Sequence, residues 1–244
     1  MRFLYFFLFV TFTISAQNKK LEVTINSITT KDVNEKNRLY HINYQIENKT
    51  KDTISFFLLP NALIANTASS STLYTVYKIY QNGKFEDMDG PFFEYETDEE
   101  LEYATLLNKE SEEAKKLLKT IQTNQAIVAM NYYKQYKDDG GISEDFKWVY
   151  YRTKLLKNIV KLNPSETKNF SIKTLWNKNR FIKNDELEYY LNENDTFEIE
   201  LILDLKTDLF KDELHEKDLK SILSNPNFIK GEFVSNKFKL DFKE

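Results

Sequence analysis

The sequence contains no cysteine and only two histidines in 244 residues, and both scarcities restrict its chemistry. Without cysteine the chain forms no disulfide, carries no lipid attached through a thiol, and lacks the residue that often completes a zinc site. His41 and His215 belong to no His-Glu-x-x-His or related pattern. We therefore expect neither a metal ion nor a histidine-based catalytic centre.

Glycine and proline are also scarce, with five and four residues respectively. Few glycines leave little material for a phosphate-binding loop, and the P-loop, the Gly-rich dinucleotide loop and the Gly-x-Ser-x-Gly motif are all absent. The segment Asp87-Met88-Asp89-Gly90 has the start of a calcium loop, but position 98, where an EF-hand needs Glu, is Asp. A polar turn is the simpler interpretation, and no cofactor is predicted.

Charged residues are numerous but balanced, with 34 Lys and Arg against 38 Asp and Glu. Because the two signs are interspersed, the chain has no basic footprint for nucleic acid. One acidic run extends from Glu94 to Glu102. It is either a cation or docking site or the acidic first turn of a helix, where each carboxylate contributes about 0.3–1 kcal/mol. The helix interpretation is favoured, because helices commonly begin with acids.

The N-terminus resembles a cleavable signal peptide. Arg2 supplies a positive charge, the uncharged apolar run Phe3 to Ile14 follows, and Ser15 and Ala16 are small. At about 1.5 Å per residue this run is too short for the ~30 Å core of a bilayer. The sequence predicts a signal peptide over 1–16, cleaved near Ala16, and an exported chain in the periplasm or the medium. An uncleaved anchor is the alternative, and no later stretch is apolar enough to span a membrane.

Alternating apolar and polar residues predict strands on both sides of a central helical block. The clearest alternations lie at Leu21–Ile25, Tyr40–Ile46, Leu73–Tyr80 and Phe197–Leu205. A further strand over Ile54–Leu59 is expected to stop at Pro60, with a loop over Asn61–Ser71. Asn82-Gly83 predicts a tight hairpin turn, and Phe238–Phe242 predicts a terminal strand.

About three helices are predicted between residues 97 and 161. Thr97 and Glu100 form a capping box, and Gly140-Gly141 should end the second helical stretch. Ser143 is the expected N-cap of a third helix, which should run to the Asn163-Pro164 pair. A short helical segment that includes Leu209, Leu214, Leu219 and Ile222 is predicted near the C-terminus and should end at Pro226.

This order of elements predicts an α+β fold. Residues 17–96 and 162–244 should form an antiparallel β-sandwich, with 97–161 as a helical insertion, since no βαβ rhythm indicates a parallel sheet. An open antiparallel sheet with helices on one face is the alternative.

Two stretches resemble known domains. The run Tyr40–Leu59 is similar to the second and third strands of immunoglobulin-like domains in exported bacterial proteins, and Leu162–Phe170 resembles a strand opening after a proline turn in the same domains. The resemblance implies an immunoglobulin-like sandwich. It carries over no activity and no site residue.

Aromatic residues are concentrated in the helical block. Tyr133, Trp148 and Tyr151 are candidate partner-binding residues there, because the adjacent pairs Tyr132-Tyr133 and Tyr150-Tyr151 cannot both point into one core. Trp176 is a second candidate surface position. A thick core between helices and sandwich is the alternative explanation for these rings.

The leading functional hypothesis is an exported, non-enzymatic binding or assembly module of a bacterial cell envelope that acts through a protein partner. One alternative is a secreted hydrolase of polysaccharide or peptide that uses two carboxylates. Another is a protease inhibitor-like sandwich that acts through the predicted loop Asn61–Ser71. The oligomeric state is left open.

Overall fold

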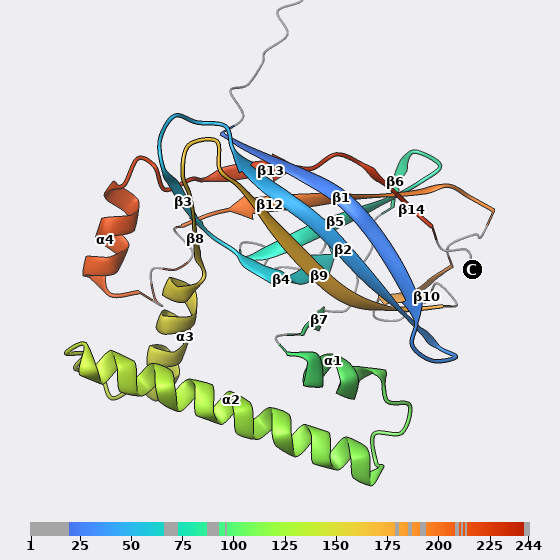
Figure 1. Ribbon diagram of the computed structural model, residues 1–244, viewed down its shortest axis with the longest axis horizontal. Coiled ribbons are helices and arrows are strands. Elements are labelled where there is room, and N and C mark those ends of the chain that lie inside the picture. The colour runs from blue at the N-terminus through green and yellow to red at the C-terminus, as the bar shows by residue number, and fades with distance from the viewer. Residues whose placement is uncertain are drawn as a thin grey trace, which may run out of the picture.

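Two β-sheets and a layer of helices make up the part of the chain described by the computed structural model (Figure 1). The described residues are 20–65, 73–86, 93–95, 97–178, 181–184, 187–190, 194–207, 210, 212 and 214–241. The predicted signal peptide and the Asp87–Gly90 segment lie outside these residues. Within them no helix has both the length and the apolar character needed to cross a bilayer.

The first sheet has three antiparallel strands in the order β1-β2-β9, with bounds Leu21–Asp32, Asn37–Asn48 and Thr167–Asn177. The predicted alternation holds along the whole of β2, where buried and half-buried residues follow one another without interruption. Ile42 of β2 lies between Ile28 of β1 and Ile172 of β9 in the register. One face of this sheet is therefore apolar and the other is polar.

The second sheet has the order β13-β12-β5-β4-β7, with β14 paired to β12 and β6 paired to β5. Asn82 and Gly83, both with positive φ, form the predicted hairpin between β5 and β6. Two separate pairs, β3 with β8 and β10 with β11, complete the strands. The remaining bounds are β3 Ile54–Phe57, β4 Leu59–Ala65, β5 Tyr74–Gln81, β6 Lys84–Glu86, β7 Phe93–Glu94, β8 Ile159–Leu162, β10 Phe181–Asn184, β11 Leu187–Tyr190, β12 Phe197–Leu205, β13 Gly231–Val234 and β14 Phe238–Leu240.

The two sheets face each other across one hydrophobic core. Buried side chains of β1, β2 and β9 meet those of β5, β12 and β14 in a single cluster. Tyr44 of β2 is fully buried there, and its hydroxyl lies 3.2 Å from Thr75 Oγ1 of β5 and 3.3 Å from the Pro60 carbonyl oxygen of β4. This hydroxyl therefore connects both sheets in the middle of the core, and burial raises the pKa of Tyr44 far above its usual value.

Pro60 does not stop a strand, contrary to the sequence prediction. β4 runs from Leu59 to Ala65, so the first five residues of the predicted loop are strand. The pairing between β4 and β5 is interrupted between Leu59 and Leu63, and the proline lies in that irregularity, where its missing N–H removes no regular ladder bond. β4 and β5 are also parallel, an exception in the otherwise antiparallel pairing of these two sheets. Residues 66–71 of the predicted loop lie outside the described part.

Three helices lie between β7 and β8 in the chain and form a layer below the sheets in Figure 1: α1 (Asp98–Thr105), α2 (Glu112–Asp138) and α3 (Phe146–Lys157). The capping box of Thr97 and Glu100 is present at α1. Gly140 takes a φ of 83° directly after α2. A fourth helix, α4 (Glu216–Ser224), packs near α3 through an apolar cluster that includes Leu155 and Ile222.

Two boundaries of α3 differ from the prediction. Its N-cap is Asp145, whose carboxylate accepts a hydrogen bond from the backbone N–H of Trp148, while Ser143 Oγ accepts from the Asp145 N–H instead. At the other end, α3 stops at Lys157 and Val160 belongs to β8, opposite Phe56 of β3. A β-branched residue beside an available strand partner favours strand, and this pairing ends the helix well before Pro164.

A buried asparagine fixes the corner where β2 leaves the first sheet. Asn48 is fully buried, and its amide nitrogen donates to the backbone carbonyls of Asp52, Leu162 and Asn163 at 2.8, 3.2 and 2.9 Å. Its oxygen accepts from the backbone N–H and the hydroxyl of Thr50. One side chain therefore satisfies polar groups of both the turn after β2 and the end of β8.

Replacing this asparagine should destabilise the fold. We expect Asn48→Ala to lower the free energy of unfolding by about 2–4 kcal/mol, because several buried carbonyls lose their donor at once. Urea denaturation followed by circular dichroism measures the change. Asn169→Ala, at an exposed position of β9, is the matched control and should change stability by less than about 0.5 kcal/mol. Equal losses of stability in Asn48→Ala and Asn169→Ala would contradict the structural role of the Asn48 hydrogen bonds.

A second prediction concerns pH. Asp32 accepts from Arg38 Nε at 2.6 Å and pairs with Lys178 at 2.8 Å, and these two cations hold the pKa of its carboxyl well below the usual value. A pKa lowered by folding adds stability above the unfolded value, near pH 4, and this stability is lost as the pH falls toward the folded value. The difference in urea midpoint between the wild type and Asp32→Asn should therefore narrow from pH 7 to pH 3.

Asp52→Asn, which removes the same charge from an exposed turn, is the control for a general effect of net charge. The assigned ion pair would be contradicted if the difference in urea midpoint between the wild type and Asp32→Asn stayed constant over this pH range. It would also be contradicted if Asp52→Asn gave the same difference at each pH.

Candidate binding groove in the helical layer

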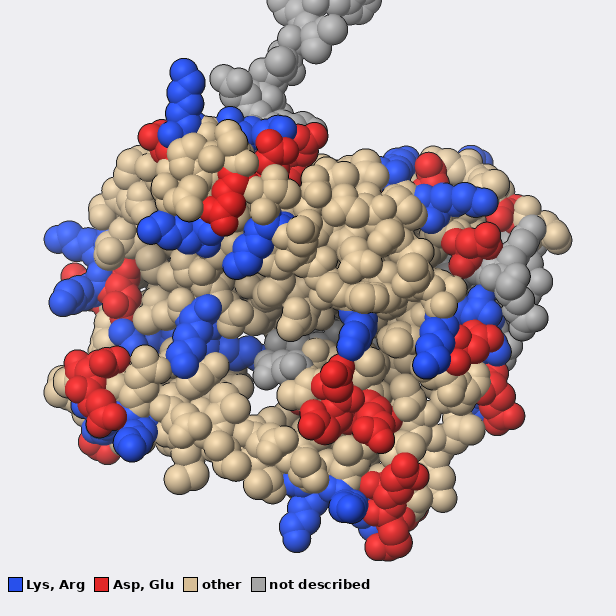
Figure 2. Space-filling model, in the orientation of Figure 1, with Lys and Arg blue, Asp and Glu red and all other residues tan. Residues whose placement is uncertain are grey.

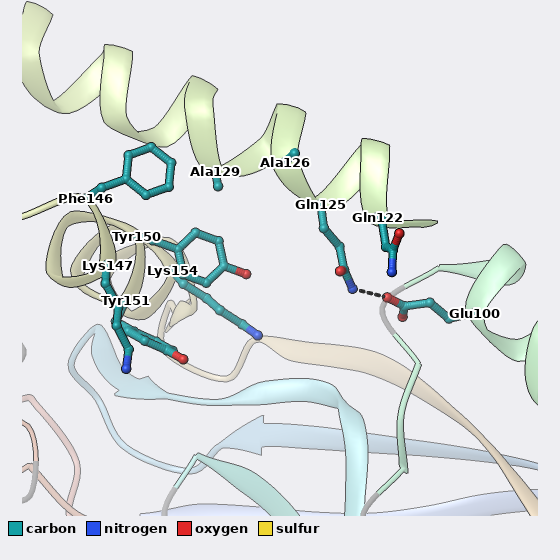
Figure 3. A pocket seen from close by; sticks show the side chains of 10 residues that line it. All are labelled: Glu100, Gln122, Gln125, Ala126, Ala129, Phe146, Lys147, Tyr150, Tyr151 and Lys154. Carbon is teal, nitrogen blue, oxygen red and sulfur yellow. Dashed lines mark hydrogen bonds between the residues drawn. The ribbon is translucent and has the colours of Figure 1, made fainter. Parts of the chain in front are cut away.

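An open groove of about 650 Å³ lies between α1, α2 and α3 (Figure 3). This volume falls within the ~300–1,000 Å³ range of small-ligand pockets. On α3, the residues Phe146, Tyr150 and Lys154 follow one another at spacings of four and share one helix face. Lys147 and Tyr151 lie beside them, also four apart. The α3 wall is therefore aromatic and cationic.

The α2 wall of the groove consists of uncharged amide and methyl side chains. Gln122, Gln125, Ala126 and Ala129 occupy one face of the helix at i, i+3, i+4 and i+7. The Gln125 amide donates a hydrogen bond of 2.9 Å to Glu100 of α1, which joins α2 to α1 at the end of the groove (Figure 3). Alanines at the centre leave room between the two helices.

A smaller hollow of about 190 Å³ continues the groove toward the second sheet. It is lined by Pro60 and Ala62 of β4 and by Val128 of α2, and it shares Tyr150 and Lys154 with the larger hollow. The two hollows are therefore adjacent. We call them together the helical groove.

The aromatic rings along the groove contact one another. Tyr132 and Tyr150 stack with ring centroids 5.8 Å apart, and Tyr150 and Tyr151 meet edge to face at 5.4 Å. The Lys157 ammonium lies 4.3 Å from the centroid of the Tyr132 ring. These contacts hold the rings in defined positions while Tyr151 is still 49% exposed.

The positive charge of the groove comes from α3, and Glu100 of α1 adds a carboxylate. Residues 146–157 include Lys147, Arg152, Lys154 and Lys157 but no acid. Arg152 points to α4, where its Nε and Nη2 donate to Asp218 Oδ2 at 3.0 and 2.6 Å. Figure 2 shows the surface hollowed between sheets and helices, with Lys and Arg side chains on one side of the hollow and both acidic and basic side chains on the other.

Of the four residues that the sequence singled out, Tyr151 lines the groove. Tyr133 lies near the end of α2, where its hydroxyl donates to Glu144 at 2.8 Å, and this hydrogen bond raises its pKa. Trp148 faces the residues that precede α4: its indole N–H donates to the Asp212 carbonyl, and its ring centroid lies 4.5 Å from that of His215, the N-cap of α4. The three helical residues therefore point to different surroundings and do not form one surface.

Trp176 is half-buried. It packs against the main core, edge to face with Tyr40 at 5.7 Å and near Tyr77 at 6.2 Å. Its part in binding a partner stays a prediction.

The acidic run behaves as the start of a helix in the residues described. Asp98 pairs with Lys173 of β9 at 2.7 Å, and this contact lowers its pKa. Glu100 closes the capping box.

Among the described residues no group of three or more His, Cys, Asp or Glu is placed to hold a metal ion. His41 contacts Ser171 on the polar sheet face, and His215 lies 3.1 Å from the Tyr136 hydroxyl.

Sequence reasoning missed most of the groove. Tyr150 was noted only as a member of an aromatic pair, and Gln125, Lys154, Ala126 and Ala129 were not singled out. The spacing of small and amide residues on α2 was the available signal. It could not show that α3 lies opposite this face, because that depends on the turn between the helices.

This turn supplies a prediction. A Cβ added to Gly141 would lie 2.3 Å from ring carbons of Tyr136, which is 5% exposed and packs against Trp148. We expect Gly141→Ala to lower the free energy of unfolding by about 1–3 kcal/mol through overpacking. Ile142→Ala, at a residue 85% exposed, is the control in the same denaturation experiment. If Gly141→Ala leaves the free energy of unfolding unchanged, the Tyr136 ring moves to accommodate the added methyl group and the expected overpacking is wrong.

Taken together, the helical groove offers fixed aromatic faces, amide groups and ammonium groups in an open, elongated space. These are the contacts by which proteins recognise extended polar chains. No protein-family model, curated protein or solved structure matches this chain.

Proposed function

We propose that this protein is an exported, non-enzymatic binding module of a bacterial cell envelope, and that it holds a segment of a protein partner in the helical groove. The observation that carries the proposal is the groove itself. It is open, it lies beside the sheet core and not within it, and its rings are held in place by contacts with one another.

The construction of α2 supports this function. Only Ala114, Ile121 and Tyr136 of its 27 residues are buried. A helix with so few buried residues adds little to the hydrophobic core. A role in forming the wall of a binding surface accounts for its length.

We further propose that the two facing sheets are an immunoglobulin-like sandwich. The two stretches that resemble such domains lie side by side, because β2 pairs with β9 and β3 pairs with β8. In this proposal the sandwich is the scaffold, and the helices between β7 and β8 form an insertion that carries the binding site.

Our proposal that the protein is exported rests on residues 1–16 alone. A positive residue, a short apolar run and small residues before a polar stretch support export. Export places the groove where partners are other envelope proteins.

Site-specific photo-crosslinking tests the groove. A photoreactive phenylalanine derivative is introduced at Ala126, which lines the groove, or at Ile127, which is 50% exposed beside it on α2. The two probes differ by one residue, or about 100° around the helix. In cells, the Ala126 probe should give a discrete adduct with one envelope protein, identified by mass spectrometry, while the Ile127 probe should not.

Ala129→Trp, which fills the centre of the groove, should abolish the adduct while the circular dichroism spectrum stays unchanged. Adducts of equal yield from both probes, or an adduct that persists in Ala129→Trp, would contradict the proposal.

A further inference from the structure

We propose that the outer face of the first sheet is a second binding site, which holds a neutral polysaccharide by hydrogen bonds. This inference goes beyond the proposed function and does not rest on the helical groove. The face belongs to β1, β2 and β9, and it consists of the side chains that alternate with the buried ones. The first sheet lies in front of the second in Figure 1, so this face is toward the viewer.

Two successive rows across this face consist of uncharged hydrogen-bonding side chains, although 30% of the whole chain is charged. Figure 2 shows a broad area over the three strands that is free of Lys, Arg, Asp and Glu, with charged side chains at its margins. Depletion of charge at the centre of a surface is typical of binding interfaces. The register places Thr24, Gln45 and Asn169 in the first row and Ser27, Asn43 and Ser171 in the second, with Asn26 beside them at the bulge of β1.

The charged residues that border these rows are paired with one another. At one end Lys49 Nζ lies 2.7 Å from a carboxylate oxygen of Glu22 and 2.9 Å from one of Glu47. At the other end Lys173 of β9 pairs with Asp98 of α1 at 2.7 Å. Because these groups direct their charges at each other, the face offers a charged ligand little attraction.

Hydrogen bonds within the face hold several of its side chains in place. The Asn43 amide donates to Ser27 Oγ at 3.0 Å, and the Asn26 amide donates to the side-chain oxygen of Gln45 at 3.2 Å. Gln45 keeps its own N–H donors for a ligand, and Asn43 keeps its side-chain oxygen. The exposed Asn169 amide has no partner within the part of the chain that the structure describes. The face therefore presents both donors and acceptors, and the ordered ones lose less entropy on binding.

The chemistry of the two rows distinguishes between classes of ligand. A nucleic acid requires cations for its phosphates, and these rows contain no Lys or Arg. The centre of a protein interface is typically rich in aromatic, Met and Arg side chains, and the rows contain none of these either. A neutral polysaccharide carries many hydroxyls and no charge. Its hydroxyls both donate to and accept from amide and hydroxyl side chains, so it complements the face.

The geometry of the open sheet favours an extended chain of sugar units. Neighbouring strands lie about 4.8 Å apart, and residues on one face of a strand follow one another at about 7 Å. This regular spacing offers similar contacts to successive sugar units, and several units held at once bind more tightly than one unit alone. Export, as proposed above, places the face beside the polysaccharides of the cell envelope.

Affinity electrophoresis of the purified full chain tests the inference. Native gels contain hydroxyethyl cellulose, dextran or galactomannan as neutral probes, or carboxymethyl cellulose as the anionic counterpart of the first. At least one neutral polymer should retard the protein, and carboxymethyl cellulose should retard it no more than hydroxyethyl cellulose does. Added salt should leave the retardation unchanged, because no ion pair forms with the ligand. If no neutral polymer retards the protein, the inference is wrong.

The double variant Asn169→Ala/Ser171→Ala removes two exposed hydrogen-bonding side chains from β9. It should lower affinity for the neutral polymer about five- to fiftyfold, while the circular dichroism spectrum stays unchanged. The matched control is Asn124→Ala/Ser221→Ala, which makes the same two changes at exposed positions of α2 and α4. The control should bind as the wild type does, and equal losses in the two double variants would contradict the assigned face.

Two further results would overturn the inference. If Ala129→Trp abolishes the retardation and Asn169→Ala/Ser171→Ala does not, the sugar chain binds in the helical groove, and the proposed function is wrong as well. If no polymer binds and the β9 variant removes a dimer detected by analytical ultracentrifugation, the face binds a second copy of this chain. Retardation that survives Ala129→Trp and is lost in the β9 variant supports a site separate from the groove.

Discussion

Burial of the Tyr44 side chain between the two sheets is the constraint on which the rest of the structure depends. Its ring stacks on Phe170 of β9, and its hydroxyl reaches Thr75 of β5 and the Pro60 carbonyl of β4. A phenol in an apolar core needs hydrogen-bond partners, so its position fixes the distance between the sheets and the position of β4. Pro60 in turn lines the smaller hollow of the groove. The core and the candidate site are therefore connected through one residue of β4.

The helical layer is stabilised by local contacts more than by burial. Caps at Thr97, Ser111 and Asp145 satisfy helix N-termini, and Arg152 with Asp218 joins α3 to α4. α2 packs against α1 and α3, and it lines the smaller hollow together with β4. The groove exists because α2 is held at a distance from the sheets. A layer built this way presents side chains to solvent at little cost to the core.

Segregation of charge on α3 gives the groove its chemical character. The arginine of this helix is used within the protein, in the ion pair with Asp218 and beside the Tyr136 ring, whereas Lys147 and Lys154 line the groove. An arginine suits a fixed contact with a carboxylate, because its guanidinium group is planar and rigid. On this helix Arg152 therefore joins α3 to α4, while Lys147 and Lys154 line the groove.

The sequence by itself determined the local structure: the strand alternation of β2 and β12, the Asn82-Gly83 hairpin, the capping box of α1 and the α+β composition all follow from short-range patterns. Such features depend on neighbours a few residues away, which a sequence displays directly. Only the tertiary structure decided that Pro60 lies within a strand, that Val160 pairs with Phe56, that Trp176 points into the core, and that Tyr150 and Lys154 face Gln125 and Ala129. Each of these depends on a partner distant in the chain, and periodicity does not specify which distant surfaces meet.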